Sequence, residues 1–273
     1  MKAAFLTQNR PEFLARIPQG MEHVVAWADQ PDGTYSPAML EKLKDVEAFL
    51  VSAEPVHAQL LEACPKVKIV QRIGVGYDTL DLEAGKARGV PMCNVAGVNK
   101  EAVAEFHIAL ILALNARVRD VVRQTRDHDW SGARGTKQQA HEISGKTIGI
   151  IGLGATGSSL ARIARGFDMK VLYNDIRPIA PSLVEELEAT SVEKEELFAQ
   201  SDFVDVCTTK NETSINMVNR ERLALMKKSA YLICCARGGI VNEPALREAL
   251  DAEQIAGAGI DVFEEEPVPQ DNV

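Results

Sequence analysis

The sequence reads Lys146-Thr-Ile-Gly-Ile-Ile-Gly152-Leu-Gly154-Ala-Thr-Gly157-Ser-Ser-Leu-Ala-Arg-Ile-Ala164 near its middle. The short apolar run Ile148–Ile151 predicts a buried parallel strand, and it stops at a cluster of glycines. After Gly157 the apolar residues recur at helical intervals. The stretch therefore predicts a strand, a tight turn and a helix.

The three glycines of this turn have the spacing of a dinucleotide-binding fingerprint. Gly152 would allow the sharp turn, Gly154 would let the backbone approach a pyrophosphate, and Gly157 would let helix and strand pack closely. The anion would rest on the helix N-terminus, where free N–H groups and the helix dipole favour negative charge. Because glycines also mark ordinary turns, the downstream sequence has to support this interpretation.

An acidic residue follows the glycines at about the distance that a dinucleotide-binding site requires. The second apolar strand, 170–175, ends in Asp175, which lies 18 positions after Gly157 and close to the ~20 typical of a ribose-binding carboxylate. A carboxylate there accepts hydrogen bonds from a free 2′-hydroxyl and repels a 2′-phosphate, so NAD is predicted over NADP. Arg177 weakens this preference without reversing it. The alternative is a solvated acid at the end of a strand.

The composition is that of a globular chain. It has 273 residues, 46% of them hydrophobic and 25% charged, with a net charge of −9. The negative charge argues against nucleic acid as a partner. No apolar run reaches the length of a membrane span, and the N-terminus lacks a signal sequence. We therefore expect a cytoplasmic protein without a membrane partner.

The five cysteines are odd in number and scattered, so buried free thiols are expected rather than disulfides, and no metal site is expected. Further strands are predicted at 202–210 and 229–239, and a last one at 256–262 leads into an acidic stretch. The apolar segment 99–117 predicts a helix that is buried or lies in a subunit interface, with His107 as a packed residue. Residues 118–142 are expected to form a polar excursion.

Four motifs together resemble those of the D-isomer-specific 2-hydroxyacid dehydrogenases, a family that includes glyoxylate/hydroxypyruvate reductases and phosphoglycerate dehydrogenases. They are Ile73-Gly-Val-Gly-Tyr-Asp78, Gly145-Lys-Thr-Ile-Gly-Ile-Ile-Gly-Leu-Gly154, Ala236-Arg-Gly-Gly-Ile-Val-Asn-Glu243 and Gly259-Ile-Asp-Val-Phe-Glu-Glu-Glu-Pro267. The resemblance runs from about Lys66 to the end. It implies an α/β fold of two doubly wound parallel-sheet domains: a flavodoxin-like substrate domain over 1–97, lacking its usual C-terminal helix, and a Rossmann cofactor domain over 98–273. It also implies a homodimer through the helix at 99–117.

The resemblance also implies roles for individual residues. Arg237 would hold the substrate carboxylate and polarise the carbonyl, and Glu266 would raise the basicity of a partner histidine. The backbone at Val75 and Gly76 would meet the substrate carboxylate. The implied cofactor contacts are Gly152, Gly154, Ala155, Thr156, Gly157, Asp175, Cys207, Cys235, Ala236 and Asp261. Without the resemblance, a salt bridge of Arg237 and a solvated Glu264–Glu266 run are equally good interpretations.

The chain departs from the family pattern in one respect that bears on catalysis. The family places its catalytic histidine in a Pro-His segment after the Glu-Pro motif, whereas the five histidines here all lie upstream of that motif. We expect the sequence to be a truncated version of a longer protein that binds NAD and turns over poorly. Smaller departures are Phe106, where many relatives carry His, and Thr209, where Pro is usual.

Three functions are compatible with these features. The leading one is an NAD-dependent oxidoreductase that transfers hydride between nicotinamide and a small D-2-hydroxy acid or 2-oxo acid. The second is an NAD(H)-sensing binding protein, similar to the corepressor members of this fold; the presence of both Arg237 and Glu266 favours the enzyme. The third is oxidation of formate or phosphite, and the apolar Val75 argues against phosphite because that branch carries Lys at this position.

Overall fold

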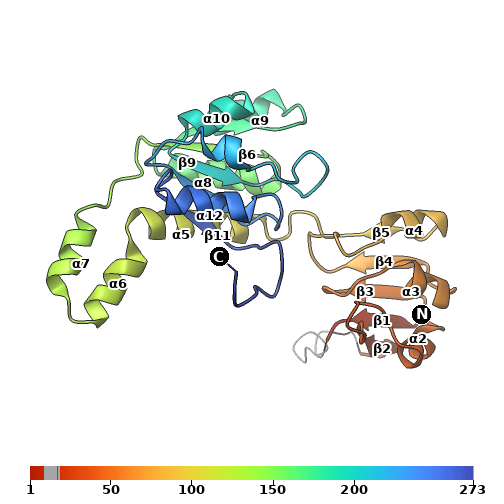
Figure 1. Ribbon diagram of the computed structural model, residues 1–273. Coiled ribbons are helices and arrows are strands. Elements are labelled where there is room, and N and C mark those ends of the chain that lie inside the picture. The colour runs from red at the N-terminus through yellow and green to blue at the C-terminus, as the bar shows by residue number, and fades with distance from the viewer. Residues whose placement is uncertain (9–16, 18, 273) are drawn as a thin grey trace. The chain divides into compact units, whose positions relative to one another are not determined.

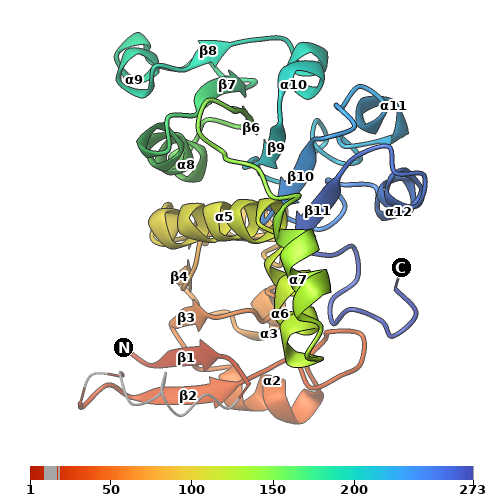
Figure 2. The same ribbon diagram turned by 90° about the vertical axis from the view of Figure 1, so that its left-hand side faces the viewer.

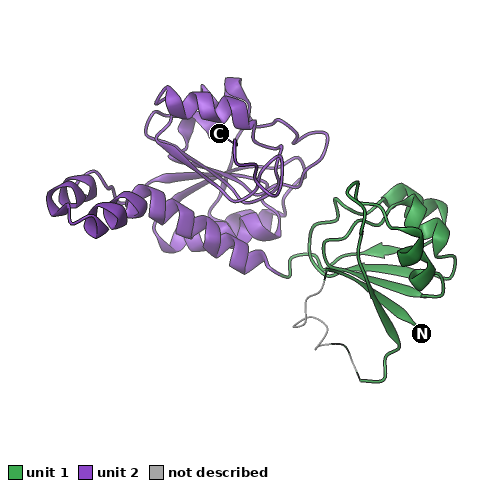
Figure 3. Ribbon diagram, turned by 60° about the horizontal axis from the view of Figure 1, so that its bottom comes forward, with its two compact units in different colours: residues 1–98 green, residues 99–273 purple. Residues whose placement is uncertain are grey.

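The computed structural model describes residues 1–8, 17 and 19–272. These residues form two compact units, Met1–Val98 and Asn99–Val273, which Figure 3 distinguishes by colour. The sequence analysis put the boundary between residues 97 and 98, and the structure divides the chain one residue later. Each unit is described by itself below.

Unit 1 contains a five-stranded parallel sheet (Figure 1). Its elements in chain order are β1 (Ala3–Leu6), β2 (His23–Ala26), α2 (Pro37–Leu43), β3 (Ala48–Val51), α3 (Ala58–Ala63), β4 (Ile69–Arg72), α4 (Leu82–Ala87) and β5 (Met92–Cys93). The strand order is β2-β1-β3-β4-β5, and all four pairings are parallel. This is the flavodoxin-like order that the resemblance implied.

The core of unit 1 lies between this sheet and the helices α2, α3 and α4. Leu43 of α2 and Leu60 of α3 are fully buried and pack against Phe49 and Val51 of β3. The helix α2 begins after Ser36, whose Oγ accepts a hydrogen bond from the backbone N–H of Met39 at 3.3 Å. The loop that follows β4 contains Val75 and Gly76 at the carboxyl ends of the strands, where open α/β sheets bind their ligands.

Unit 2 contains a six-stranded parallel sheet. Its elements are α5 (Lys100–Asn115), α6 (Val118–Arg126), α7 (Trp130–Lys137), β6 (Thr147–Ile151), α8 (Ala155–Gly166), β7 (Lys170–Asn174), α9 (Pro181–Leu187), β8 (Thr190–Ser191), α10 (Lys194–Gln200), β9 (Phe203–Val206), α11 (Arg220–Leu223), β10 (Tyr231–Cys234), α12 (Glu243–Asp251) and β11 (Gly257–Ile260). The strand order β11-β10-β9-β6-β7-β8 is the classical doubly wound order of a dinucleotide-binding domain. The order reverses between β6 and β9, which makes this the topological switch point.

Helices cover both faces of this sheet, as Figure 2 shows. Successive residues of β9 illustrate why, because side chains alternate between the faces of a strand. Phe203 packs into the cluster formed with α5 and α8, whereas Val204 packs into the cluster formed with α10, α11 and α12. The prediction of two doubly wound α/β domains is confirmed for the fold class.

Several elements differ from the sequence-based expectation. Residues 118–142, expected as a polar excursion, contain the two helices α6 and α7, and α6 has no buried residue. A left-handed Arg117 (φ 51°) ends the preceding helix, and Asp129 caps α7 by accepting a hydrogen bond from Gly132 N–H at 2.8 Å. The strand expected over 202–210 ends at Val206. Within the described residues, no helix has the length and apolar character needed to cross a membrane.

Candidate functional site

The turn between β6 and α8 has the geometry that its glycines predict. Gly152 adopts φ +94°, a conformation that favours glycine. A Cβ on Gly157 would lie 2.1 Å from the carbonyl oxygen of Gly152, so strand and helix approach each other too closely for any side chain there. The helix α8 starts at Ala155 and Thr156, and its N-cap Gly154 offers no side chain to the first-turn N–H groups. These groups are suited to hold an anion.

The carboxylate of Asp175 is fixed beside this turn. One of its oxygens, Oδ2, accepts a hydrogen bond from Leu153 N–H at 2.9 Å, and Oδ1 accepts one from Arg177 N–H at 2.9 Å. The side chain is only 5% exposed, and its Oδ1 lies 3.5 Å from Nε of Arg177. The guanidinium of Arg177 also lies near the turn, with one terminal nitrogen 3.6 Å from the position of a Cβ on Gly154. The strand end predicted to hold a ribose therefore lies at the glycine turn.

A pocket opens at the carboxyl ends of β6, β7 and β9. Its lining includes Ile151, Gly152, Asn174, Asp175, Thr208 and Met217. Ligands of open α/β sheets bind in this position, outside the strand ends and at the switch point. The uncapped helix, the missing side chain at Gly157 and the carboxylate in the pocket together fit a dinucleotide, which would place its pyrophosphate on α8 and its ribose at Asp175.

The carboxyl ends of β10 and β11 bring together three of the predicted residues. Arg237 follows β10 and donates a hydrogen bond from Nη1 to the carbonyl oxygen of Ala236 at 2.6 Å. A Cβ on Gly238 would lie 1.7 Å from the carbonyl oxygen of Phe263, so the loop that carries Arg237 lies directly against the loop after β11. Glu266 is part of that second loop and accepts a hydrogen bond from Phe263 N–H at 3.0 Å.

Asp261 lies at the same edge of the sheet, directly after β11. Its N–H donates a hydrogen bond to the carbonyl oxygen of Cys234 at 3.0 Å, and its side chain is exposed. The backbone of Cys235 and Ala236 lies between Cys234 and Arg237, at the end of β10. The predicted nicotinamide-side residues of unit 2 thus share one edge of one sheet, with the glycine turn at the same edge.

Val75 and Gly76 belong to unit 1 and lie in the loop after β4. The carbonyl oxygen of Val75 accepts a hydrogen bond from Asn94 Nδ2 at 2.7 Å, and that of Gly74 accepts one from Val95 N–H at 3.0 Å. These two bonds hold the loop against the segment after β5. Their role towards a substrate stays a prediction.

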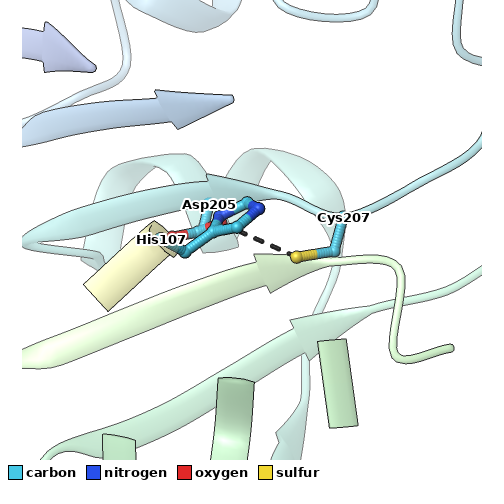
Figure 4. Close-up of side chains that lie close together, drawn as sticks. All are labelled: His107, Asp205 and Cys207. Carbon is cyan, nitrogen blue, oxygen red and sulfur yellow. Dashed lines mark hydrogen bonds and ion pairs between the residues drawn. The ribbon is translucent and has the colours of Figure 1, made fainter. Parts of the chain in front are cut away.

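The sequence analysis missed a buried polar cluster beneath the cofactor edge of the sheet. Figure 4 shows that His107 of α5, Asp205 of β9 and Cys207 lie close together. His107 and Asp205 are 1% and 0% exposed and are joined by a hydrogen bond between Nδ1 and Oδ1. Sequence reasoning treated His107 as a packed residue and left its partner unnamed. The available signal was a carboxylate inside the apolar strand Phe203–Val206 together with a histidine on the buried face of a helix.

The protonation of this cluster follows from its surroundings. Burial by itself would lower the pKa of His107, but the adjacent Asp205 carboxylate outweighs it and raises that pKa above its usual value. Burial also raises the pKa of Cys207 well above the range of a reactive thiol, and the Asp205 charge adds to this effect. The Asp205 carboxylate thus favours the protonated form of His107, and burial favours the neutral thiol of Cys207.

All five cysteines are free thiols, as predicted, but the expected burial holds only for two of them, since Cys93, Cys207 and Cys235 are half-buried. Cys64 and Cys234 are buried, and burial raises the pKa of each to about 11. Burial likewise raises the pKa of Cys235. Thiols of this kind are structural rather than nucleophilic.

Comparison with known proteins agrees with this geometry. The family model described as D-isomer specific 2-hydroxyacid dehydrogenase, NAD binding domain, matches residues 108–273. A glyoxylate reductase from Korarchaeum cryptofilum is 36% identical over 98% of this chain and 81% of its own length. One from Pyrococcus horikoshii is 37% identical over 96% of this chain and 80% of its own length.

Solved structures give the same result. The D-lactate dehydrogenase from Aquifex aeolicus, in complex with NAD and lactic acid, superposes with a TM-score of 0.85 at 27% identity, covering 98% of this chain and 78% of that one. The TT0316 protein from Thermus thermophilus superposes with a TM-score of 0.84 at 29% identity, covering 99% and 85% of the two chains. The glycine turn, the acid after β7 and the arginine after β10 are thus found in a chain that belongs to the D-isomer-specific 2-hydroxyacid dehydrogenase family of NAD-dependent enzymes.

Proposed function

We propose that this enzyme interconverts small 2-oxo acids and D-2-hydroxy acids, with glyoxylate among its substrates. The observation that carries the proposal is the position of Arg237, which the steric contact between Gly238 and Phe263 holds at the same sheet edge as the glycine turn. Support for glyoxylate comes from the names of the relatives that match at 35 to 37% identity.

The proposed roles follow from the chemistry of each group. The guanidinium of Arg237 would bind a carboxylate bidentately and stabilise negative charge that develops on the neighbouring carbonyl oxygen. Asp261 would accept a hydrogen bond from a carboxamide, with the backbone of Cys235 and Ala236 beside it. Glu266 would orient the imidazole of the histidine that the family places after the Glu-Pro motif, and would raise its pKa; the sequence does not contain that histidine. The backbone N–H groups at Val75 and Gly76 would bind the substrate carboxylate. The bound nicotinamide supplies or accepts the hydride.

The test is oxidation of NADH, followed at 340 nm, with glyoxylate, hydroxypyruvate and pyruvate offered separately. Turnover that saturates with at least one of these acids supports the proposal, and slow turnover suffices, because the sequence contains no histidine after the Glu-Pro motif. The second candidate, an NAD(H)-sensing binding protein, predicts NADH binding in calorimetry without turnover of any of the three acids. Reduction of NAD+ by formate, with no NADH oxidation by any of the three 2-oxo acids, would overturn the proposed substrate class.

The choice of NAD over NADP is expected to depend on the charge of Asp175. In Asp175→Asn the amide oxygen can still accept the hydrogen bond from Leu153 N–H, whereas the hydrogen bond from the exposed Arg177 N–H is lost. Loss of the negative charge removes the repulsion of a 2′-phosphate, and we expect the preference for NADH over NADPH to fall by about ten-fold or more, from the ~1.5–3 kcal/mol of a hydrogen bond to a charged group. Titration of the protein with NADH and with NADPH gives the two dissociation constants, whose ratio measures this preference.

The control for this change is Asp251→Ala, which removes an exposed carboxylate on α12 that pairs with Arg247. The ratio of the two dissociation constants should remain that of the unmodified protein in this variant. An unaltered ratio in Asp175→Asn would show that another group discriminates between the cofactors.

We also propose a homodimer formed through the helices α5, α6 and α7. Exposed apolar side chains that gather on a surface mark interaction sites, and these helices carry Phe106, Leu112, Val118, Val122 and Trp130. Sedimentation equilibrium is expected to give twice the chain mass. The variant Val122→Glu/Trp130→Glu should shift the equilibrium towards the single chain, because burying two carboxylates opposes association. Retention of the dimer would place the interface elsewhere.

A further inference from the structure

The hydrogen-bonded pair of His107 and Asp205 is buried among apolar residues, where ionisable side chains are uncommon. Around it, α5 packs on the sheet through apolar residues that include Ala104, Ile108 and Ile111. Buried ion pairs in such surroundings are often no more stabilising than apolar residues of similar volume, because both charges lose their hydration. Stability alone therefore gives a poor account of a charged pair at the centre of this interface.

Unlike an apolar contact, the hydrogen bond between His107 and Asp205 forms at only one position of α5 relative to β9. Oδ1 of Asp205 accepts the hydrogen bond from His107 Nδ1–H and lies 3.7 Å from the Sγ of Cys207. Oδ2 of Asp205 is buried and has no hydrogen-bond partner among the described residues. A displacement of α5 by one turn would leave the buried carboxylate with only the weak thiol donor of Cys207, which is costly. Leucine or valine at the same positions would tolerate such a displacement.

The end of β9 that carries Asp205 is also in contact with the Gly152 turn. Cys207, two residues after Asp205, donates a hydrogen bond from its N–H to the carbonyl oxygen of Ile151 at 2.9 Å. Its own carbonyl oxygen lies 3.0 Å from the place of a Cβ on Gly152, so the two backbones are in close contact. Thr208, the next residue, lines the pocket together with Gly152. Movement of the end of β9 would therefore move the wall of the pocket.

We propose that His107 and Asp205 are positioning residues of the cofactor site. Their hydrogen bond ties the carboxyl end of β9 to α5, and this fixes the strand end whose next residues contact the Gly152 turn; the affinity for NAD(H) depends on that strand end. The inference rests on the proposed use of this edge of the sheet for the cofactor. It deepens that function by assigning a role to two residues that need not touch the cofactor.

The decisive variant replaces both charges by apolar residues of similar size. In His107→Leu/Asp205→Val no buried charge is left unpaired, so the thermal unfolding midpoint is expected to stay near that of the unmodified protein. The dissociation constant for NADH, measured by quenching of protein fluorescence or by calorimetry, is expected to rise about ten-fold or more because the pocket wall is no longer held in place. A stable double variant with unchanged NADH affinity would overturn the proposal.

Two further variants separate geometry from stability. Asp205→Asn keeps an acceptor for His107 Nδ1–H and should bind NADH within about three-fold of the unmodified protein, whereas Asp205→Ser is too short to reach and should weaken binding about ten-fold. This comparison decides the question if the double variant does not fold. Equal NADH affinity of the Asn and Ser variants would contradict a positioning role.

The matched control is Ser201→Ala, at the amino-terminal side of the same strand. Ser201 is fully buried and donates a hydrogen bond from Oγ to the carbonyl oxygen of Leu197 at 2.6 Å. Its removal loosens the core away from the pocket, so the unfolding midpoint should fall while NADH affinity is retained. Loss of affinity in this control would mean that any core defect weakens binding, and it would overturn the inference. Absence of NADH binding by the unmodified protein would instead refute the proposed function.

Discussion

In Arg237→Ala, kcat/KM for glyoxylate or another 2-oxo acid is expected to fall about 10²–10⁴-fold, with little change in the dissociation constant for NADH. The magnitude follows from the ~2–5 kcal/mol lost when one member of a buried charge pair is removed, and from the similar loss when a donor to developing negative charge is deleted. Arg237→Lys should recover only part of the loss, since a point charge does not reproduce the bidentate geometry of a guanidinium. Steady-state kinetics with separate NADH titration measure both quantities.

The control for this prediction is Arg247→Ala. Arg247 is an exposed arginine on α12 that bonds to Asp251 one turn away, and the kinetics should remain those of the unmodified enzyme. A fall in kcat/KM of less than about three-fold in Arg237→Ala would contradict the assignment, because a carboxylate held by this guanidinium cannot lose its main partner at so small a cost.

The second large effect is expected at the glycine turn. A methyl group on Gly157 would lie 2.1 Å from the carbonyl oxygen of Gly152 and 3.1 Å from a side-chain carbon of Ile150. In Gly157→Ala the helix α8 must therefore move away from β6, and the first-turn N–H groups move with it. We expect NADH affinity to fall about 100-fold, since displacement of binding groups by about 1 Å has effects of this order.

Gly166→Ala provides a control within the same helix. Gly166 ends α8, and a Cβ added there would meet no atom within 4 Å, so alanine should leave NADH binding unchanged and stabilise the helix slightly. Circular dichroism and the unfolding midpoint show whether Gly157→Ala is still folded. A folded Gly157→Ala variant with full NADH affinity would mean that the cofactor does not rest on α8.

The sequence predicted those parts of the fold whose signals are local. The strand–turn–helix at Gly152 to Gly157 is determined by steric limits within a few residues, and the structure contains it where the glycine spacing indicated. The strands near Phe203 and Tyr231 were also predicted, because apolar runs of that length in an α/β chain are buried on both faces. Their ends were less accurate, since Cys207 and Thr208 continue the chain out of the sheet after Val206.

The parts that sequence reasoning missed depend on partners distant in the chain or on weak propensities. The pair of His107 and Asp205 joins residues 98 positions apart, and no local pattern links them. The helix α6 does carry valines at helical spacing, Val118, Val121 and Val122, but its many charged residues favoured a polar excursion, and α7 has a single buried residue, Ala133. The motifs placed Arg237 and Glu266 at the ends of strands. No local pattern links Gly238 to Phe263, whose backbone contact joins the two loops.

The strand order of unit 2 has a consequence for synthesis of the chain on the ribosome. Its middle strand, β6, pairs with β7 on one side and with β9 on the other. Translation of the roughly 50 residues that separate β6 from β9 takes about 3–10 seconds at 5–20 residues per second. Throughout that interval one edge of an apolar strand has no neighbour and is open to pairing with other nascent chains. Chaperone occupancy on ribosomes should therefore be highest between the emergence of Ile151 and that of Phe203.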